Sequence, residues 1–140
     1  MLCCVMVAAM VVLGGATRLT ESGLSIVDWR PISGIFPPLN SAEWQSLFDA
    51  YRQSPEFKRT NFWMSLGDFK TIYWLEYLHR LWGRVIGLVF LIPFLWFVVR
   101  GQVSRGFALR LGAVFLLGGL QGLMGWYMVK SGLVDNPHVS

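Results

Sequence analysis

Charge is scarce in this sequence, and it is scarcest where the chain is most hydrophobic. Only 14% of the 140 residues are charged, whereas 54% are hydrophobic and 15% are aromatic. This composition is poorly suited to a water-soluble surface and indicates a membrane protein. The net charge of +4 lies in and beside the hydrophobic segments, so it gives no reason to expect a nucleic acid as a partner.

Cysteine is almost absent as well. Cys3 and Cys4 are the only two, and they are adjacent within an apolar run, where the geometry of a structural disulfide is hard to satisfy. We expect both to be packing residues. The sequence therefore predicts no disulfide and says nothing about the redox compartment.

Three apolar runs remain, and they predict transmembrane helices at about 1–16, 72–99 and 107–129. The first run is short for a hydrocarbon core of about 30 Å, and it has no basic segment before it that would indicate a signal peptide. We interpret it as a transmembrane helix whose start is missing. In the second run only 85–99 is uninterrupted, so the helix must include upstream residues.

The distribution of charge between these runs predicts the orientation of the chain. The segment 17–71 is neutral overall, whereas Arg100, Arg105 and Arg110 form a short basic loop without an acidic residue. By the positive-inside rule this loop faces the cytoplasm, and 17–71 is then an exported loop. We expect the inner membrane of a bacterium rather than that of a mitochondrion.

The exported loop contains one predicted helix. Its first half is rich in turn-forming residues, including Pro37 and Pro38, and a helix start follows at Ser41. An amphipathic face then consists of Trp44, Leu47, Phe48 and Tyr51. This helix could lie on the membrane surface or cover a site, but we favour packing onto the loop's own core.

The strongest chemical pattern is a Glu-x-x-His pair at the start of the second run. On a helix, Glu76, His79, Arg80 and Arg84 lie close to one face. Ionisable groups at membrane depth cost from about 2.5 kcal/mol each, so they usually face a cavity, a partner or a cofactor. The structural alternative is that Glu76 only pairs with Arg80 and that His79 bonds to the loop.

A haem site explains these residues better than a metal-carboxylate site does. A di-metal bundle needs further glutamates on other helices, and the first and third runs contain no acidic residue. Imidazole is a common ligand of haem iron, and guanidinium groups pair with carboxylates such as the haem propionates. The second histidine, His138, follows Pro137 in a polar tail, and we do not expect it to be a ligand.

Three segments resemble the haem A synthase family. The segment from Gly14 to Ser25, GGATRLTESGLS, is similar to the first-loop motif of that family. The segment EYLHRLWGR, residues 76–84, resembles its E-x-x-H-R-x-x-G-R motif, and residues 121–133 resemble the end of its third helix. The resemblance extends in order along the whole chain.

This resemblance implies an all-α membrane protein of eight helices, built from two similar four-helix bundles. The 140 residues would be three transmembrane helices of the first bundle, which takes haem O as its substrate. The ligands of a haem b cofactor, and a partner histidine for the first bundle, would follow after Ser140. We therefore expect that this fragment alone does not turn over.

The resemblance also implies the reaction and the roles of the residues. A ring methyl group of haem O would be oxidised to a formyl group by successive hydroxylations and loss of water, giving haem A for a terminal oxidase. His79 would be an axial ligand of the substrate iron and Glu76 the catalytic acid beside it, while Arg80 and Arg84 would bind the propionates. Expected partners are membrane lipid, haem O synthase, an electron donor and a second copy of the chain.

Two other functions fit the same residues. A b-type cytochrome fragment would carry electrons with the same histidine and arginines, but it would not need Glu76. A non-catalytic membrane assembly factor would bind no pigment, so His79→Ala would change nothing. Because the family-like segments are spread over the whole chain, we favour the enzyme.

Overall fold

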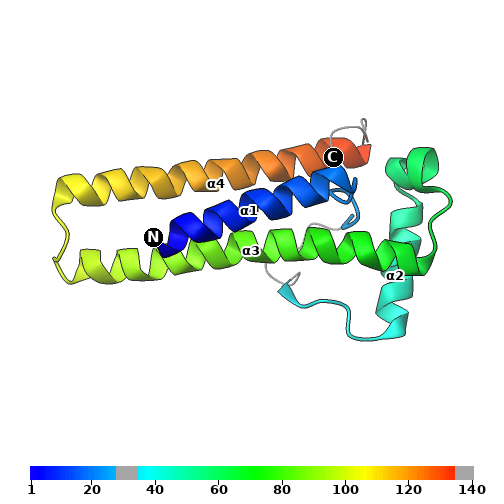
Figure 1. Ribbon diagram of the computed structural model, residues 1–140, viewed down its shortest axis with the longest axis horizontal. Helices are drawn as coiled ribbons and strands as arrows, with labels where there is room; N and C mark the ends of the chain where they lie inside the picture. The colour runs from blue at the N-terminus through cyan, green and yellow to red at the C-terminus, as the bar shows by residue number, and fades with distance from the viewer. Residues whose placement is uncertain (28–34, 135–140) are drawn as a thin grey trace.

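The computed structural model describes residues 1–27 and 35–134, and this part of the chain is helical throughout, without a β-strand. The elements are α1 (Leu2–Leu19), α2 (Ser41–Arg52), the short π-helix η2 (Phe57–Asn61), α3 (Leu66–Val99) and α4 (Arg105–Val134). Helices α1, α3 and α4 are long and apolar enough to cross a membrane. They run side by side, and α2 lies across the end of the bundle at which α3 begins (Figure 1). We call this the loop end. The prediction of an all-α membrane protein with three spans is confirmed.

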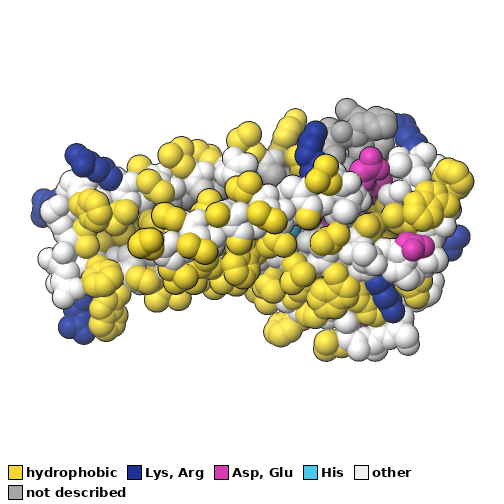
Figure 2. Space-filling model, viewed as in Figure 1, with side chains coloured by type: hydrophobic (Ala, Val, Ile, Leu, Met, Phe, Trp, Pro, Cys, Tyr) yellow, Lys and Arg dark blue, Asp and Glu magenta, His cyan; other side chains and the backbone are white. Residues whose placement is uncertain are grey.

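Helix α3 contacts both of the other long helices, through small and aromatic residues. Where α1 crosses α3, the Trp82 indole donates a hydrogen bond to the Met6 carbonyl at 2.9 Å. A Cβ on Gly83 would lie 3.3 Å from the Met10 methyl group, so the two helices are closely packed there. Helix α4 contacts α3 through the stacked rings of Phe90 and Phe115, whose centroids are 5.8 Å apart. Elsewhere apolar side chains cover the outside of the bundle (Figure 2), as expected for surfaces that face lipid or further helices.

Helix α3 begins before the apolar run that predicted it. Ser65 and Asp68 form a capping box, in which each side chain accepts a hydrogen bond from the backbone N–H of the other residue. The helix therefore starts at Leu66 rather than near Ile72, and it continues through Pro93 to Val99. Its 34 residues span about 51 Å, against about 30 Å for a hydrocarbon core. Helix α3 is thus longer than the hydrocarbon core is thick, and we expect its first part to extend beyond the lipid.

The helix predicted in the loop is confirmed as α2, but its packing partner differs from the one we favoured. Asn40 caps its start by accepting a hydrogen bond from the Glu43 amide at 2.8 Å. Its buried face consists of Trp44, Phe48 and Tyr51, which pack against the first two turns of α3. The Tyr51 and Phe69 rings lie 5.1 Å apart. The apolar face of α2 therefore covers the start of α3 instead of a core made by the loop alone.

The opposite end of the bundle is short and basic. Gly101, with a φ of +67°, ends α3 and turns the chain toward α4. The Arg100 guanidinium lies over the Trp96 ring, 4.5 Å from its centroid. Lys and Arg side chains gather at this end (Figure 2). The buried polar and charged side chains of the described residues lie instead toward the loop end.

Candidate functional site

Glu76 is the centre of the predicted site, and it is buried on α3 with 2% of its surface exposed. Its Oε2 accepts hydrogen bonds from the Ser25 hydroxyl at 2.6 Å and from the Ile26 amide at 2.8 Å. Its Oε1 accepts a hydrogen bond from the Arg80 guanidinium, one turn further along α3. Both carboxylate oxygens are therefore held in place, as a residue that must face one reacting atom requires.

The donors from Ser25 and Ile26 reach Glu76 because the chain turns sharply after α1. The Thr17 hydroxyl donates to the Gly14 carbonyl at 2.8 Å, and both the amide and the hydroxyl of Ser22 donate to the Thr17 carbonyl. Glu21 takes a left-handed conformation with a φ of +49°, which is unusual for a residue other than glycine. The segment 14–25, noted in the sequence as a motif, thus contains the donor Ser25 and leads directly to the donor Ile26, two of the three residues that bond to Glu76.

His79 is half-buried, and its imidazole faces α1 at Gly14. A Cβ on Gly14 would stand 3.2 Å from Nε2, which is closer than side chains normally approach, and 3.7 Å from Cδ2 of the ring. The imidazole therefore packs tightly against α1, and a larger residue at position 14 would press on its Nε2 edge. Nε2 is also a nitrogen that binds haem iron in proteins.

Arg80 is engaged with the protein itself. Its guanidinium bonds to Glu76 and lies 3.5 Å from the Ile26 carbonyl oxygen. The pairing of Glu76 with Arg80, which the structural alternative predicted, is therefore present. It does not account for Ser25 and Ile26, however, since a simple ion pair on the helix surface would need neither. Arg84 lies one turn further on, where the same face continues.

A second carboxyl group that the sequence did not single out is buried nearby. Glu56 precedes η2 and has 3% of its surface exposed, yet neither of its oxygens has a hydrogen-bond partner in the described part of the chain. Burial raises the pKa of Glu56 from 4.5 to about 7, and the negative charges of Glu76 and Glu21 add to the effect. The neighbouring Tyr51 is fully buried, and burial also raises the pKa of its phenol. At pH 7 the Tyr51 phenol is therefore neutral, whereas Glu56 exchanges between its acid and carboxylate forms.

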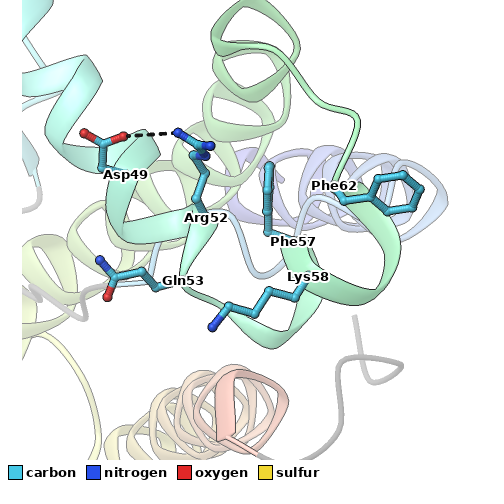
Figure 3. Close-up of a pocket in the computed structure, with 6 residues that line it drawn as sticks. All are labelled: Asp49, Arg52, Gln53, Phe57, Lys58 and Phe62. Carbon is cyan, nitrogen blue, oxygen red and sulfur yellow. Dashed lines mark ion pairs between the residues drawn. The ribbon is translucent and has the colours of Figure 1, made fainter.

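The hollows on the described surface lie away from Glu76 and His79. One is between α2 and η2 and is lined by Asp49, Arg52, Gln53, Phe57, Lys58 and Phe62 (Figure 3). It includes the ion pair between Arg52 and Asp49, at 3.9 Å. Another lies on α4 and is lined by Gly119, Gly122, Leu123 and Trp126. Neither of these two hollows is lined by a residue of the predicted site.

Sequence analysis identified Glu76, His79, Arg80 and Arg84, and the structure places them on consecutive turns of α3. It joins Glu76 to Arg80 and turns His79 toward α1. Sequence reasoning missed Gly14, Ser25 and Ile26 as contacts of these residues, although all three belong to or follow the quoted motif. It also missed Glu56, for which the sequence offers no local signal. His138 lies outside the described residues.

Comparison with known proteins gives a consistent result along the whole chain. The family model for cytochrome oxidase assembly proteins matches residues 1–140. The chain is 62% identical over 138 residues to a heme A synthase of Paramagnetospirillum magneticum, covering 99% of this chain and 39% of that protein. It has the same identity and coverage with the heme A synthase of Nitrosospira multiformis. For that of Rhodospirillum centenum the identity is 57%, over 100% of this chain and 37% of the relative. The chain thus spans about two fifths of the length of these relatives, and no solved structure matches it.

Proposed function

Because this chain belongs to the family of cytochrome oxidase assembly proteins, we propose that it forms the part of a haem A synthase that binds haem O and presents a ring methyl group to Glu76. The observation that supports this most directly is the convergence of two segments on one carboxylate. The turn after α1 donates to Glu76 from Ser25 and Ile26, and His79 follows one turn later on the same helix, where it packs against α1. A structural ion pair would not require this arrangement.

Each residue has a role in holding the substrate. His79, whose ring packs against Gly14 of α1, would be an axial ligand of the haem O iron through its imidazole. Arg84 would bind a propionate through its guanidinium. Arg80, which also donates to Glu76 and to the Ile26 carbonyl oxygen, would bind the second propionate. Haem is thereby fixed at its iron and at its polar edge, which leaves the ring methyl group as the part to be positioned.

Glu76 then acts on the carbon that is oxidised. The methyl group becomes a formyl group by successive hydroxylations and loss of one water, and the hydroxyl protons must be accepted and released in that last step. A carboxylate fixed by three hydrogen bonds can accept a proton from the new hydroxyl group without moving. The residue is therefore assigned as the general base of the dehydration.

The remaining features of the proposal concern the whole protein. Haem b would be a redox cofactor of the whole protein. The described part contains one histidine, His79, which would bind the substrate haem. The ligands of haem b would then lie in the part of the relatives that this chain does not cover. The basic loop would lie on the cytoplasmic side of a bacterial inner membrane. Haem O synthase would supply the substrate, and a separate protein would donate electrons. A second copy of the chain would be a further partner.

The experiment is a pyridine haemochrome spectrum of protein purified in detergent from cells that also make haem O. Wild type should retain haem O or haem A, His79→Ala should lose it, and the matched control His138→Ala should keep it. The comparison is repeated with the chain extended by the remainder of the Paramagnetospirillum magneticum relative, because the chain spans 39% of that protein. Haem b that is unaffected by His79→Ala, or no haem in the extended protein, would overturn the proposal.

A further inference from the structure

A short apolar segment before α2 is exposed in the structure. Phe36 has 76% of its surface exposed and Leu39 has 81%, and Ile35 is exposed as well. Pro37 and Pro38 complete the segment 35–39, which contains no charged residue. Single exposed apolar side chains are normal on any protein, whereas a contiguous apolar surface marks a contact with a partner or a membrane.

A hydrogen bond fixes the level of this segment along α3. The Tyr77 hydroxyl donates to the Ile35 carbonyl oxygen. Because the side chain of a helical residue leans toward the start of its helix, Ile35 lies level with Tyr77 or slightly before it. Figure 1 shows the segment, in cyan, beside α3 and away from the start of that helix. Tyr77 is about three turns, or about 16 Å, past that start at Leu66.

This level coincides with the expected edge of the membrane. About twenty residues of α3 are enough to cross the hydrocarbon, and counted back from its end at Val99 they place the edge near Arg80. Tyr77 is then about 4–5 Å further out, and the headgroup layer is about 5–7 Å thick on each side. We therefore expect the segment 35–39 to lie in the headgroup layer, within a side chain's length of the hydrocarbon.

The backbone of the segment is suited to a place with little water. Pro37 and Pro38 have no backbone N–H, and the Leu39 N–H donates to the Glu43 carboxylate at 2.8 Å. The Ile35 carbonyl oxygen accepts the hydrogen bond from α3. Polar backbone groups without partners are costly beside lipid. A non-helical segment can therefore enter the interface when such groups are absent or bonded, as they are at these four residues.

We propose that residues 35–39 form a lipid anchor, which inserts Phe36 and Leu39 into the bilayer leaflet at the loop end and holds the start of α2 close to the membrane surface. The occupant is lipid because the segment is uncharged, lies at the expected edge of the membrane and continues the apolar outside of the bundle (Figure 2). Trp74 and Leu78 on α3 are exposed near the same level, and aromatic residues are enriched at membrane interfaces. The proposal depends on the level of the segment and not on haem.

Phe62 supplies a matched control for Phe36. It is also exposed, with 70% of its surface, and it follows η2 directly. Figure 1 shows η2 and the loop after it at the start of α3, about 16 Å from the level of Tyr77. Because this distance exceeds the thickness of the headgroup layer, we expect Phe62 to stay in water.

The test measures whether lipid or water surrounds these positions. In a chain with Cys3→Ser and Cys4→Ser, a fluorescent label is attached in turn through Phe36→Cys, Leu39→Cys and the control Phe62→Cys. Each protein is reconstituted in phosphatidylglycerol vesicles, with a nitroxide on the lipid acyl chains in one sample and iodide on both sides of the membrane in another. The nitroxide should quench the labels at 36 and 39, and iodide should quench them at least about threefold less than the label at 62.

Two results would overturn the proposal. If iodide quenches the labels at 36 and 39 as strongly as the label at 62, the segment lies in water. If neither quencher reaches them, protein covers the segment, as a second copy of the chain would. The measurement is repeated in the extended protein, where further helices could cover it and where we expect the same lipid contact. The labels at 36 and 39 report separately, so the test stays informative if one variant fails to fold.

Discussion

The imidazole of His79 lies against Gly14, so that a methyl group added at residue 14 would be 3.2 Å from Nε2. Helices α1 and α3 are therefore tightly packed beside the residue predicted to bind iron. The contact links the first-loop motif to the Glu-x-x-His motif through packing, in addition to the hydrogen bonds from Ser25 and Ile26.

Gly14→Ala tests this contact. The new methyl group should displace the His79 ring and weaken haem O binding at least about tenfold, with an overpacking cost of about 1–3 kcal/mol. Gly15→Ala is the matched control, because nothing lies within 4 Å of a Cβ at that position. It should leave haem binding unchanged and, by helix propensity, stabilise α1 by at most about 1 kcal/mol. Equal haem binding in the two variants would contradict the proposed contact.

Ser25→Ala tests the hydrogen bonds that the turn makes to Glu76. The variant removes a buried donor to a carboxylate, which should cost about 1.5–3 kcal/mol of stability. Thermal unfolding in detergent measures the loss, and Ser46→Ala, at an exposed position on α2, should stay within about 0.5 kcal/mol of wild type. If both variants unfold at the same temperature as wild type, Ser25 does not stabilise the site.

Glu76→Gln distinguishes an enzyme from an electron carrier. Glutamine keeps the size of the side chain and can still bond to Ser25, but it cannot accept a proton as a carboxylate does. We expect haem O to remain bound and its conversion to haem A to fall by about 100-fold or more in the extended protein. Chromatography of the extracted haems measures the conversion. Unchanged conversion would favour the b-type cytochrome.

The pKa of Glu56 predicts how stability depends on pH. Its pKa is raised from 4.5 to about 7 in the folded protein. Its contribution to the free energy of unfolding is therefore fully retained below about pH 4.5 and is lost as the pH rises through 7. The reason is that Glu56 ionises at a lower pH in the unfolded chain than in the folded protein. The loss amounts to about 3 kcal/mol. Glu56→Gln should remove this pH dependence in thermal unfolding between about pH 5 and pH 8, whereas Asp49→Asn should keep the wild-type slope.

Sequence alone predicted the class, the three long helices, α2 and the residues of α3 that carry the site. These features follow from hydrophobic runs and helical spacing, which are local properties. The early start of α3 also had a local signal, since Ser65 and Asp68 have the spacing of a capping box. Hydrophobicity alone places the start of this helix near Ile72, so it leaves the first two turns of α3 in the loop.

The contacts that complete the site could not be predicted in this way. Ser25 bonds to a residue 51 positions further along the chain, and no periodicity specifies such a pairing. The burial of Glu56 depends on how α2 and η2 fold over α3, which composition does not determine. Gly14 was noticed as part of a motif, but the reason for glycine there is visible only once His79 is placed opposite.

The length of α3 has a consequence for energetics at the scale of the membrane. About twenty residues of this helix are enough to cross the hydrocarbon, so we expect the residues before Arg80 to lie beyond it, on the side that the positive-inside rule assigns to the exterior. A proton exchanged with water on that side does not cross the membrane electric field, which acts at about 2.3 kcal/mol per charge for 100 mV. The ionisation of Glu56 should therefore be independent of the transmembrane potential.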